Sequence, residues 1–202
     1  MNFLAHIYLS GNNEDIRLGN FFGDWVKGKK DKWNTKYTED IKQGIIIHRF
    51  IDDFTDRHEI VKKSASLFSE KYRHYSKVIT DIIYDHFLAH NWHLFSDIEL
   101  EKYAYDFYRL LISKFFILPI QVKIFLPYLI ASNRLVSYNN IEGIRKTLEI
   151  MSKNTSLPNH TEFAIDVLNQ HYDELRNDSI KYINLIISEI SKIYNLKIKA
   201  TV

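Results

Sequence analysis

The chain has 202 residues, no cysteine and a formal net charge of +2, and 46% of its residues are hydrophobic. This length and apolar fraction suit one globular domain and exclude a disordered chain. The lack of cysteine excludes disulfides, thiolate zinc sites and cysteine nucleophiles. The near-neutral charge argues against a nucleic-acid binder, which usually carries a dense basic stripe.

The first eleven residues, MNFLAHIYLSG, are apolar but lack the basic stretch and the long apolar core of a signal peptide. The later run IIIHRFIDD is too short and too charged to cross a bilayer. We therefore expect a cytoplasmic protein that is not embedded in a membrane.

Helical periodicity continues through nearly the whole chain, and convincing runs of alternating apolar and polar residues are absent. A helix is expected to begin at Thr38, because acidic residues in the next positions favour the positive end of a helix. Within this helix, a buried stripe is expected at Ile47, Phe50, Ile51 and Phe54.

Further helices are expected at residues 72–93, 98–116, 120–135, 141–153 and 160–194. Pro127 is expected to kink or break the helix that contains it, and the last helix is expected to bend near residues 177–178. Helical periodicity thus predicts an all-α protein in which residues 1–202 form a single helical domain.

Two helical segments concentrate metal-binding residue types. His48 and Asp52 are four residues apart, so their side chains lie on one face of a helix, close enough to share a cation. Asp81, Asp85 and His86 form the second group, in which Asp85 has apolar neighbours and needs a cation or strong donors if it is buried. The alternatives are a helix-surface pair in the first segment and neutralisation by an Arg or Lys in the second.

Two isolated residues are weaker candidates. Asp24 follows a glycine among aromatic residues and could also stabilise a turn, and His6 has apolar neighbours and could also be a buried structural histidine. His90 and His93 continue a row from His86, but we interpret both as structural, because histidines near the carboxyl end of a helix interact favourably with its dipole. Spacing alone indicates a metallohydrolase and no more.

Four ordered blocks carry a family resemblance. MNFLAH, GNFFGDWVKG, GIIIHRFIDDFTDRH and DIIYDHFLAHNW together resemble the acyl carrier protein phosphodiesterase family, a divergent branch of the HD phosphohydrolases, over roughly the first half of the chain. Residues 126–151 resemble the second half of the family more loosely. No His-Asp dipeptide of the usual HD type is present.

The resemblance implies a fold of the HD-phosphohydrolase type, with residues 1–202 as a single helical phosphodiesterase domain. The reaction that it implies is hydrolysis of holo-acyl carrier protein to the apo carrier and free 4′-phosphopantetheine, with Mn²⁺ as the cofactor and Mg²⁺ as the alternative. Imidazole and carboxylate groups suit such hard ions. It also implies metal binding by His48, Asp52 and Asp85, with Asp24 as a further ligand. Catalytic roles are expected for the following residues: His6, Asp24, Asp81 and His86. Among these, His6 would orient a ligand or protonate the serine leaving group.

The carrier is acidic in this family, so a basic rim beside the metal would speed and orient its approach. Candidates are Lys27, Lys29 and Lys30 after Asp24, together with Arg49; the alternative is an ordinary solvated loop. No nucleic-acid or membrane partner is expected, and the oligomeric state is left open. The rival functions are an HD-type hydrolase of nucleotides and a helical carrier-binding module without catalysis.

Overall fold

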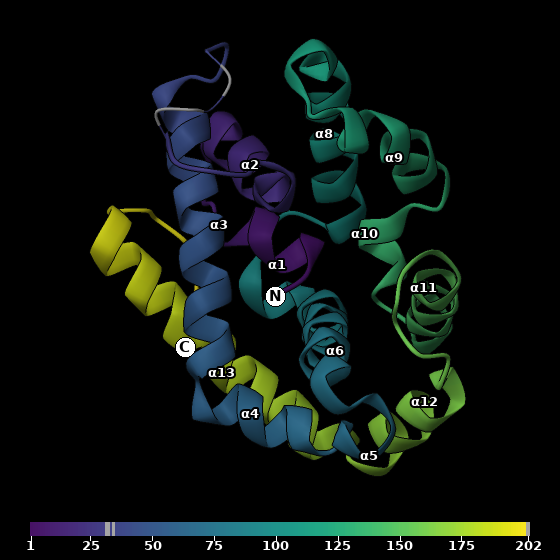
Figure 1. Cartoon of the computed structure of the whole chain (residues 1–202). Coiled ribbons are helices and arrows are strands. Elements are labelled where there is room, and N and C mark those ends of the chain that lie inside the picture. The colour runs from purple at the N-terminus through teal and green to yellow at the C-terminus, as the bar shows by residue number, and fades with distance from the viewer. Residues whose placement is uncertain (31–32, 34, 201–202) are drawn as a thin grey trace.

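The computed structural model describes residues 1–30, 33 and 35–200, and this part of the chain is helical without a strand (Figure 1). The all-α prediction is therefore confirmed. The α-helices are α1 (Phe3–Tyr8), α2 (Glu14–Phe21), α3 (Glu39–Arg57), α4 (Glu59–Ser66), α5 (Ser69–Tyr72), α6 (Ser76–His90), α7 (Trp92–Phe95), α8 (Leu100–Ser113), α9 (Ile120–Ala131), α10 (Arg134–Ser137), α11 (Ile141–Asn154), α12 (Thr161–Gln170) and α13 (Tyr172–Tyr194). Short 3₁₀ helices are η1 (Gly23–Trp25), η3 (Arg73–Tyr75) and η4 (Phe115–Ile117).

Helix α3 begins where its sequence predicts. The Thr38 hydroxyl accepts a hydrogen bond from the N–H of Ile41 at 3.2 Å and so caps the helix. Ile47 and Ile51 are buried, whereas Phe50 and Phe54 are only partly buried and pack against aromatic residues of α13. The buried face of α3 thus includes His48, which faces the interior of the molecule, and does not include the two phenylalanines.

Helix α2 packs closely along α3. A Cβ atom on Gly44 would lie 2.2 Å from the carbonyl oxygen of Ile16, so a larger residue at this position would push the two helices apart. The close approach matters for the site, because it brings the end of α2 and the following η1 turn against the middle of α3.

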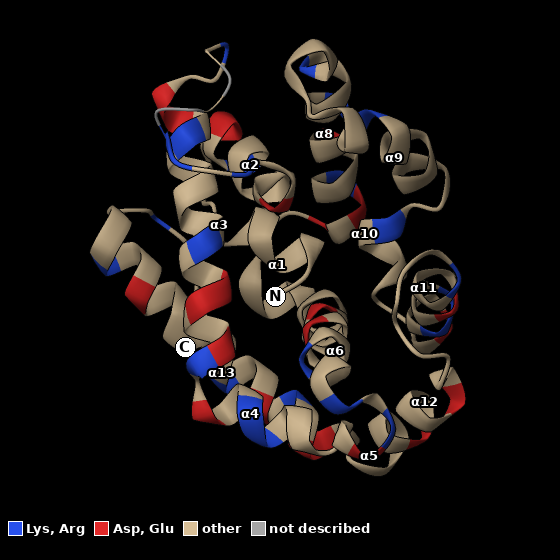
Figure 2. Cartoon of the chain, viewed as in Figure 1, with Lys and Arg blue, Asp and Glu red and all other residues tan. Residues whose placement is uncertain are grey.

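The N-terminal helix α1 lies near the centre of the molecule and packs on α2 and α6 (Figure 1). Helix α13 packs on α3, α4 and α6, and so supports the helices on which α1 rests. Acidic residues of α3 and α6 lie on either side of the N-terminus (Figure 2). The fold thus places the start of the chain between the two segments in which the sequence concentrates carboxylates.

Two helix boundaries differ from prediction because single residues adopt left-handed backbone conformations. The helix expected at residues 72–93 is interrupted at Arg73, which has a φ of 48°, so that α6 starts only at Ser76. Asn133 has a φ of 43° and separates α9 from α10, and asparagine tolerates this conformation well. Pro127 does not end α9, which continues to Ala131.

The segment expected as one helix at residues 160–194 is two helices, α12 and α13, with the break at His171. No break occurs at residues 177–178, where Asp178 is paired with Lys63 at 3.1 Å instead of bonding to its own backbone. None of the helices in the described part of the chain combines the length and apolar character that a membrane span requires.

Candidate metal centre

Two stacked imidazoles form the centre of the site. His6 of α1 and His48 of α3 have ring centroids 4.1 Å apart, and both residues are buried. The side chain of Asn2 caps the first turn of α1, and Thr38 caps α3, so each histidine sits on a helix whose start is fixed. The sequence separates these two histidines by 42 positions, and the packing of α1 and α3 around α2 brings them together.

Asn20 at the end of α2 holds both rings. Its side-chain Oδ1 lies 2.8 Å from His6 Nδ1, and its backbone carbonyl oxygen lies 2.7 Å from His48 Nδ1. The amide orientation of Asn20 is fixed, because Ser10 Oγ donates to the carbonyl of His6 and therefore accepts from Asn20 Nδ2 at 2.8 Å. Both Nδ1 atoms must then donate a proton to an Asn20 oxygen. This leaves the Nε2 atom of each ring as the group that faces the centre.

Two carboxylates approach these Nε2 atoms. Asp52 of α3 places one oxygen 3.2 Å from His6 Nε2 and the other 3.1 Å from His48 Nε2. Asp24 of η1 places an oxygen 3.2 Å from His48 Nε2. The side chains of Asp24 and Asp52 are 67% and 44% exposed, so the site is closed by imidazoles on one side and open to solvent on the other.

The pKa values show how strongly these groups interact. Burial, and then the neighbouring His48, lower the pKa of His6 to about 4, so His6 is neutral at pH 7. Burial also opposes charge on His48, but Asp24 and Asp52 outweigh it and raise the pKa of His48 to about 9. Burial works against ionisation of Asp52 too, yet the two histidines hold its pKa well below its ordinary value. The carboxylates of Asp24 and Asp52 therefore favour a positive charge beside the imidazole nitrogens.

A divalent cation would supply this positive charge. His6, His48 and Asp52 each offer one ligand atom, and these atoms lie within 4.8 Å of one another. The lone pair of His6 Nε2 faces an Asp52 oxygen at 3.2 Å and the Met1 carbonyl oxygen at 3.1 Å, which places three acceptors together without a proton between them. His48 Nε2 is buried and makes no well-aligned hydrogen bond. A cation would satisfy all these atoms, and the Asn20 contacts are the outer hydrogen bonds that metal-binding histidines usually make.

Gly23 keeps this arrangement open. A Cβ atom at Gly23 would lie 2.4–2.7 Å from atoms of the His48 side chain. Glycine is therefore required immediately before Asp24, because any side chain would displace the imidazole. This explains the Gly-Asp pair in the sequence better than a turn-stabilising aspartate does.

The second predicted group does not join the first. Both oxygens of Asp85 accept hydrogen bonds from the backbone N–H groups of Leu4 and Ala5, at 2.8 and 3.1 Å, and so stabilise the start of α1. Burial raises the pKa of Asp85 to about 7. Asp81 pairs with the amino group of Met1 at 3.0 Å. Asp85 was expected to bind metal, but its oxygens are occupied by backbone donors, and Asp81 holds the N-terminus.

The histidines of α6 bind backbone and phenol groups. His86 was expected to be catalytic, but its Nδ1 lies 2.8 Å from the carbonyl oxygen of Tyr138 and its Nε2 lies 3.1 Å from the hydroxyl of Tyr172. His90 Nδ1 lies 3.3 Å from the carbonyl oxygen of Asn139. These contacts tie α6 to the segment after α10. The geometry therefore gives His86 a positioning role in place of a catalytic one.

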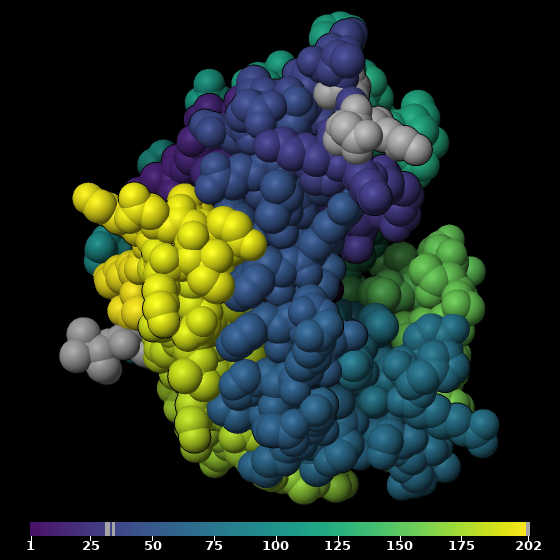
Figure 3. Space-filling model, turned by 60° about the vertical axis from the view of Figure 1, so that its left-hand side comes forward, coloured from purple at the N-terminus to yellow at the C-terminus, as the bar shows by residue number. Residues whose placement is uncertain are grey.

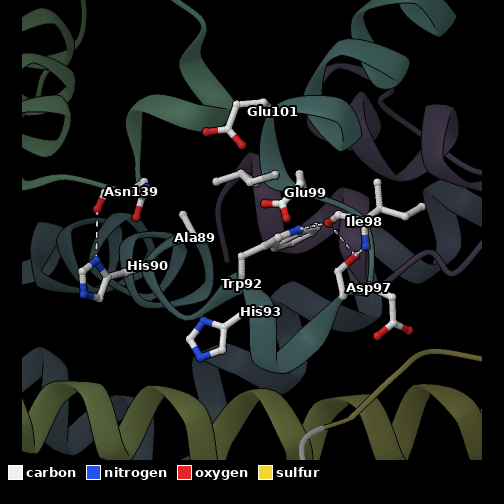
Figure 4. Close-up of a pocket in the computed structure, with 11 residues that line it drawn as sticks. Ala89, His90, Trp92, His93, Asp97, Ile98, Glu99, Glu101 and Asn139 are labelled. Atoms are coloured by element: carbon white, nitrogen blue, oxygen red, sulfur yellow. Dashed lines mark hydrogen bonds between the residues drawn. The ribbon is translucent and has the colours of Figure 1, made fainter.

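A separate polar cavity of about 240 Å³ lies at the end of α6. His90, His93 and the acidic residues Asp97, Glu99 and Glu101 line it, but their side chains point in different directions (Figure 4). Among the residues that the structure describes, only His6, His48 and Asp52 form a group compact enough for one ion. The polar cavity at the end of α6 is therefore not a second metal centre.

The basic residues beside Asp24 differ in the contacts that they make. Lys27 and Lys29 are exposed, whereas Lys30 pairs with Glu39 at 2.7 Å. Arg49 donates to the carbonyl oxygens of Val26 and Gly28 at 2.9 and 3.0 Å and lies over the ring of Trp33. The guanidinium therefore holds the loop that carries these lysines.

The structure thus groups four of the predicted residues, His6, Asp24, His48 and Asp52, around the two Nε2 atoms. Asp81 and Asp85 bind the neighbouring start of the chain instead, and His86 binds Tyr138 and Tyr172. Sequence reasoning gave His6 a catalytic role, whereas its position beside His48 makes it a candidate ligand. It missed Asn20 entirely. The signal available for Asn20 was a polar residue at the buried end of a short helix, one position before two phenylalanines.

Comparison with known proteins identifies the family of the chain. The model of the family described as acyl carrier protein phosphodiesterase matches residues 1–185. The acyl carrier protein phosphodiesterases of Photorhabdus laumondii and Yersinia pestis are 41% and 39% identical to the chain over 92 residues, which cover 46% of this chain and 45% and 46% of those relatives. The protein of the same name from Enterobacter sp. is 29% identical over 181 residues, or 88% of this chain and 91% of that one.

The chain spans about half of the length of the Photorhabdus laumondii and Yersinia pestis proteins that it matches. No solved structure matches the chain. The family match over most of the chain is decisive for classification. The chain belongs to the acyl carrier protein phosphodiesterase family.

Proposed function

We propose that this protein is a metal-dependent phosphodiesterase that hydrolyses holo-acyl carrier protein to the apo carrier and 4′-phosphopantetheine. The observation that carries the proposal is the group of His6, His48 and Asp52. Asn20 holds the two imidazoles by their Nδ1 atoms, and their Nε2 atoms face a carboxylate at 3.1–3.2 Å. Relatives named acyl carrier protein phosphodiesterase and the family match support the choice of substrate.

The ion would be Mn²⁺, with Mg²⁺ as the alternative, because the ligand set contains carboxylate and imidazole without sulfur. His6, His48 and Asp52 would hold it, and Asp24 would complete the set at the open side. When bound, such an ion lowers the pKa of water and neutralises charge that develops on a phosphoryl oxygen.

Two residues of the group, Asp24 and His6, would have different roles in the reaction. The nearby His48 lowers the pKa of Asp24, which keeps this carboxylate ionised, and its 67% exposure places it where substrate and water arrive. Asp24 is thus suited to take the proton of the attacking water. Water forms a bond to phosphorus as Asp24 takes its proton, and the bond between phosphorus and the serine oxygen breaks. The serine oxygen takes up a proton from solvent, and Asp24 returns its proton to solvent, so the protons balance. Neutral His6 has no Nε2 proton to give, so we assign it to holding the ion.

The acidic carrier would approach over the loop that follows Asp24. Lys27 and Lys29 are exposed there, and Arg49 fixes the loop through its two hydrogen bonds to backbone carbonyls. Positive charge beside the open side of the metal group would attract an acidic protein and raise its rate of association.

The direct test incubates purified protein with holo-acyl carrier protein in Mn²⁺ or in a chelator and measures the intact mass of the carrier. We expect loss of the phosphopantetheine mass only with metal. Turnover of small nucleotides without turnover of the carrier would instead support the rival nucleotide hydrolase. A folded protein that leaves both substrates unchanged would support a binding module without catalysis.

A further inference from the structure

The exposed hydrophobic side chains of the molecule are concentrated in one segment. Eleven large hydrophobic side chains are exposed in the described residues, and seven of them lie between positions 105 and 128, in α8, η4 and α9. Phe116 is 85% exposed and Ile124 is 74% exposed. Single exposed apolar residues are ordinary, but a group of this size usually marks an interaction surface.

Five of these side chains belong to η4 and α9, and we call them the apolar face. They are Phe115, Phe116, Ile120, Ile124 and Tyr128. The last three are spaced by four residues, so they lie along one side of α9, at the edge of the molecule (Figure 1). The opposite side of α9 packs into the core. Helix α9 is therefore apolar both where it is buried and where it is exposed.

The charges around the apolar face have one sign. No acidic residue occurs between Asp106 and Glu142, whereas this segment contains four basic residues. Residues 107–141 thus carry a formal charge of +4, and the 23 basic and 25 acidic residues in the rest of the chain give −2. Helix α9 accordingly carries blue but no red in Figure 2. Such an asymmetry of charge favours an anionic partner for this segment.

Two of the basic residues have no carboxylate to neutralise them. Lys123 donates to the carbonyl oxygen of Phe116 at 3.1 Å and lies over the ring of Phe115, which holds η4 beside α9. Arg109 is exposed and lies over the ring of Tyr105. In residues 1–30, 33 and 35–200, neither cation forms an ion pair. The apolar face is thus bordered by cations that can still bind an anion.

This pattern distinguishes among possible partners. A second copy of the chain would bring the same cations toward each other, because a two-fold interface pairs a surface with itself. A protein partner usually forms about one hydrogen bond per 100–200 Å² of interface, yet the polar side chains of residues 111–128 are only Ser113, Lys114, Gln121, Lys123 and Tyr128. An anionic phospholipid layer fits better, because its hydrocarbon takes up apolar side chains and its phosphates attract basic ones.

We propose that the apolar face binds the surface of an anionic lipid bilayer. Phe116 and Ile120 enter the boundary between headgroups and hydrocarbon, and Arg109 and Lys123 extend to the phosphates. Helix α9 has 12 residues, whereas a helix that crosses a bilayer needs about 20, so α9 lies along the surface. The proposal departs from the expectation of no membrane partner, because the sequence does not show which apolar residues are exposed.

Flotation of the full chain with vesicles tests the proposal. We expect binding to vesicles of phosphatidylcholine and phosphatidylglycerol in equal parts, and little binding to phosphatidylcholine alone. Phe116→Ser combined with Ile120→Ser should weaken binding by about tenfold or more, because both side chains lose the apolar surface that enters the lipid. Both side chains are exposed, and surface substitutions of this kind seldom unfold a protein.

The matched control changes two exposed isoleucines outside the apolar face. Ile98 and Ile193 are 48% and 51% exposed, and Ile98→Ser combined with Ile193→Ser should bind vesicles as the wild type does. Ile193 belongs to α13, which forms the yellow surface beside α3 in Figure 3, whereas the teal-green residues of α8 and α9 appear only at the upper edge of that view. The control therefore removes similar apolar surface at a different place.

Two further measurements locate the contact. Arg109→Glu combined with Lys123→Glu should weaken binding to the anionic vesicles, more at low salt than at high salt. The fluorescence of the variant Phe116→Trp should be quenched by brominated lipid beyond the signal of the wild type. Ile193→Trp should show no such added quenching. This comparison remains informative if the double serine variant folds poorly.

Three results would overturn the proposal. The first is a wild type that does not bind anionic vesicles, or that binds them no better than the variant with serine at positions 116 and 120. The second is a dimer, seen by light scattering, that this variant loses without any vesicle binding, which would assign the apolar face to a second copy. The third is a raised KM for holo-carrier in this variant, again without vesicle binding, which would assign the face to the carrier. Vesicle binding requires no metal, so the proposed reaction stands or falls separately.

Discussion

Helices α3 and α6 each carry histidine and aspartate at helical spacing, yet the fold uses them differently. On α3, the carboxylate of Asp52 meets two imidazole nitrogens, and neither of its oxygens accepts a backbone N–H group. On α6, both oxygens of Asp85 accept backbone N–H groups of α1. Sequence spacing is the same kind of signal in both helices, and the partner that reaches the carboxylate decides its role.

The atoms that already surround a carboxylate decide whether it can bind an ion. A carboxylate whose lone pairs already accept from backbone donors has little left for an ion, whereas one that faces other acceptors requires a cation. The two groups are linked through α1, because Asp85 fixes the start of the helix that carries His6. The acidic group of α6 therefore supports the site from outside it.

The largest expected effect comes from exchanging one carboxylate in each group for its amide. Asp52→Asn should lower metal-dependent activity by about 10³-fold or more, since the stabilisation that a metal provides is worth several kcal/mol. Asp85→Asn should leave the metal stoichiometry unchanged. Activity assays and metal analysis on both variants test this difference, and loss of the ion in Asp85→Asn alone would contradict it.

Removal of the Asp85 side chain should act on stability. Asp85→Ala leaves two N–H groups at the start of α1 without their acceptor, which costs on the order of 1–3 kcal/mol. Denaturant unfolding of the metal-free protein measures this change, with Asp97→Ala as a control, because Asp97 is exposed and paired only with Lys199. Equal stability of the Asp85 variant and the wild type would contradict the capping role.

Asn20→Ala tests the orientation of the histidines more finely. This change removes the acceptor of His6 Nδ1 while the backbone acceptor of His48 remains. Loss of an outer hydrogen bond to a metal-binding histidine typically weakens metal binding by about 10–100-fold, and we expect a loss in that range for Mn²⁺. An unchanged Mn²⁺ affinity would show that the tautomer of His6 is irrelevant to the site.

The pKa of His48 gives the site a pH dependence. Because the carboxylates raise this pKa to about 9 without metal, a proton occupies His48 at pH 7 and competes with the cation. Mn²⁺ affinity should therefore rise by up to about tenfold per pH unit between pH 6.5 and 9. Stability of the metal-free protein should change oppositely, since the contribution of His48 is complete below pH 6.5 and is lost as the pH rises through 9. Mn²⁺ titrations at constant ionic strength would refute this by showing an affinity independent of pH.

The smallest effect concerns the basic loop. The double variant Lys27→Glu and Lys29→Glu should raise KM for holo-carrier several-fold, more at low salt than at high salt, with no change on a small phosphodiester. Lys181→Glu with Lys192→Glu on α13 makes the same change of charge elsewhere on the surface. If both pairs alter carrier kinetics alike, the loop has no special part in docking.

The sequence predicts most helices because their apolar spacing and caps are local, as Thr38 shows for α3. It does not predict the break at His171, which separates α12 from α13. For the site, the i, i+4 pair of His48 and Asp52 is visible in the sequence. The partners of His6 and Asp85 are 14 to 81 positions away in the sequence. Only tertiary packing therefore reveals that His6 belongs to the metal group and that Asp85 does not.

A crystal structure with Mn²⁺, located by its anomalous scattering, tests the central claim most directly. We expect one ion within bonding distance of His6 Nε2, His48 Nε2 and an oxygen of Asp52, with Asp85 still accepting from Leu4 and Ala5. An ion bound by Asp85 or His86, or a soaked crystal in which the three predicted atoms bind none, would contradict it.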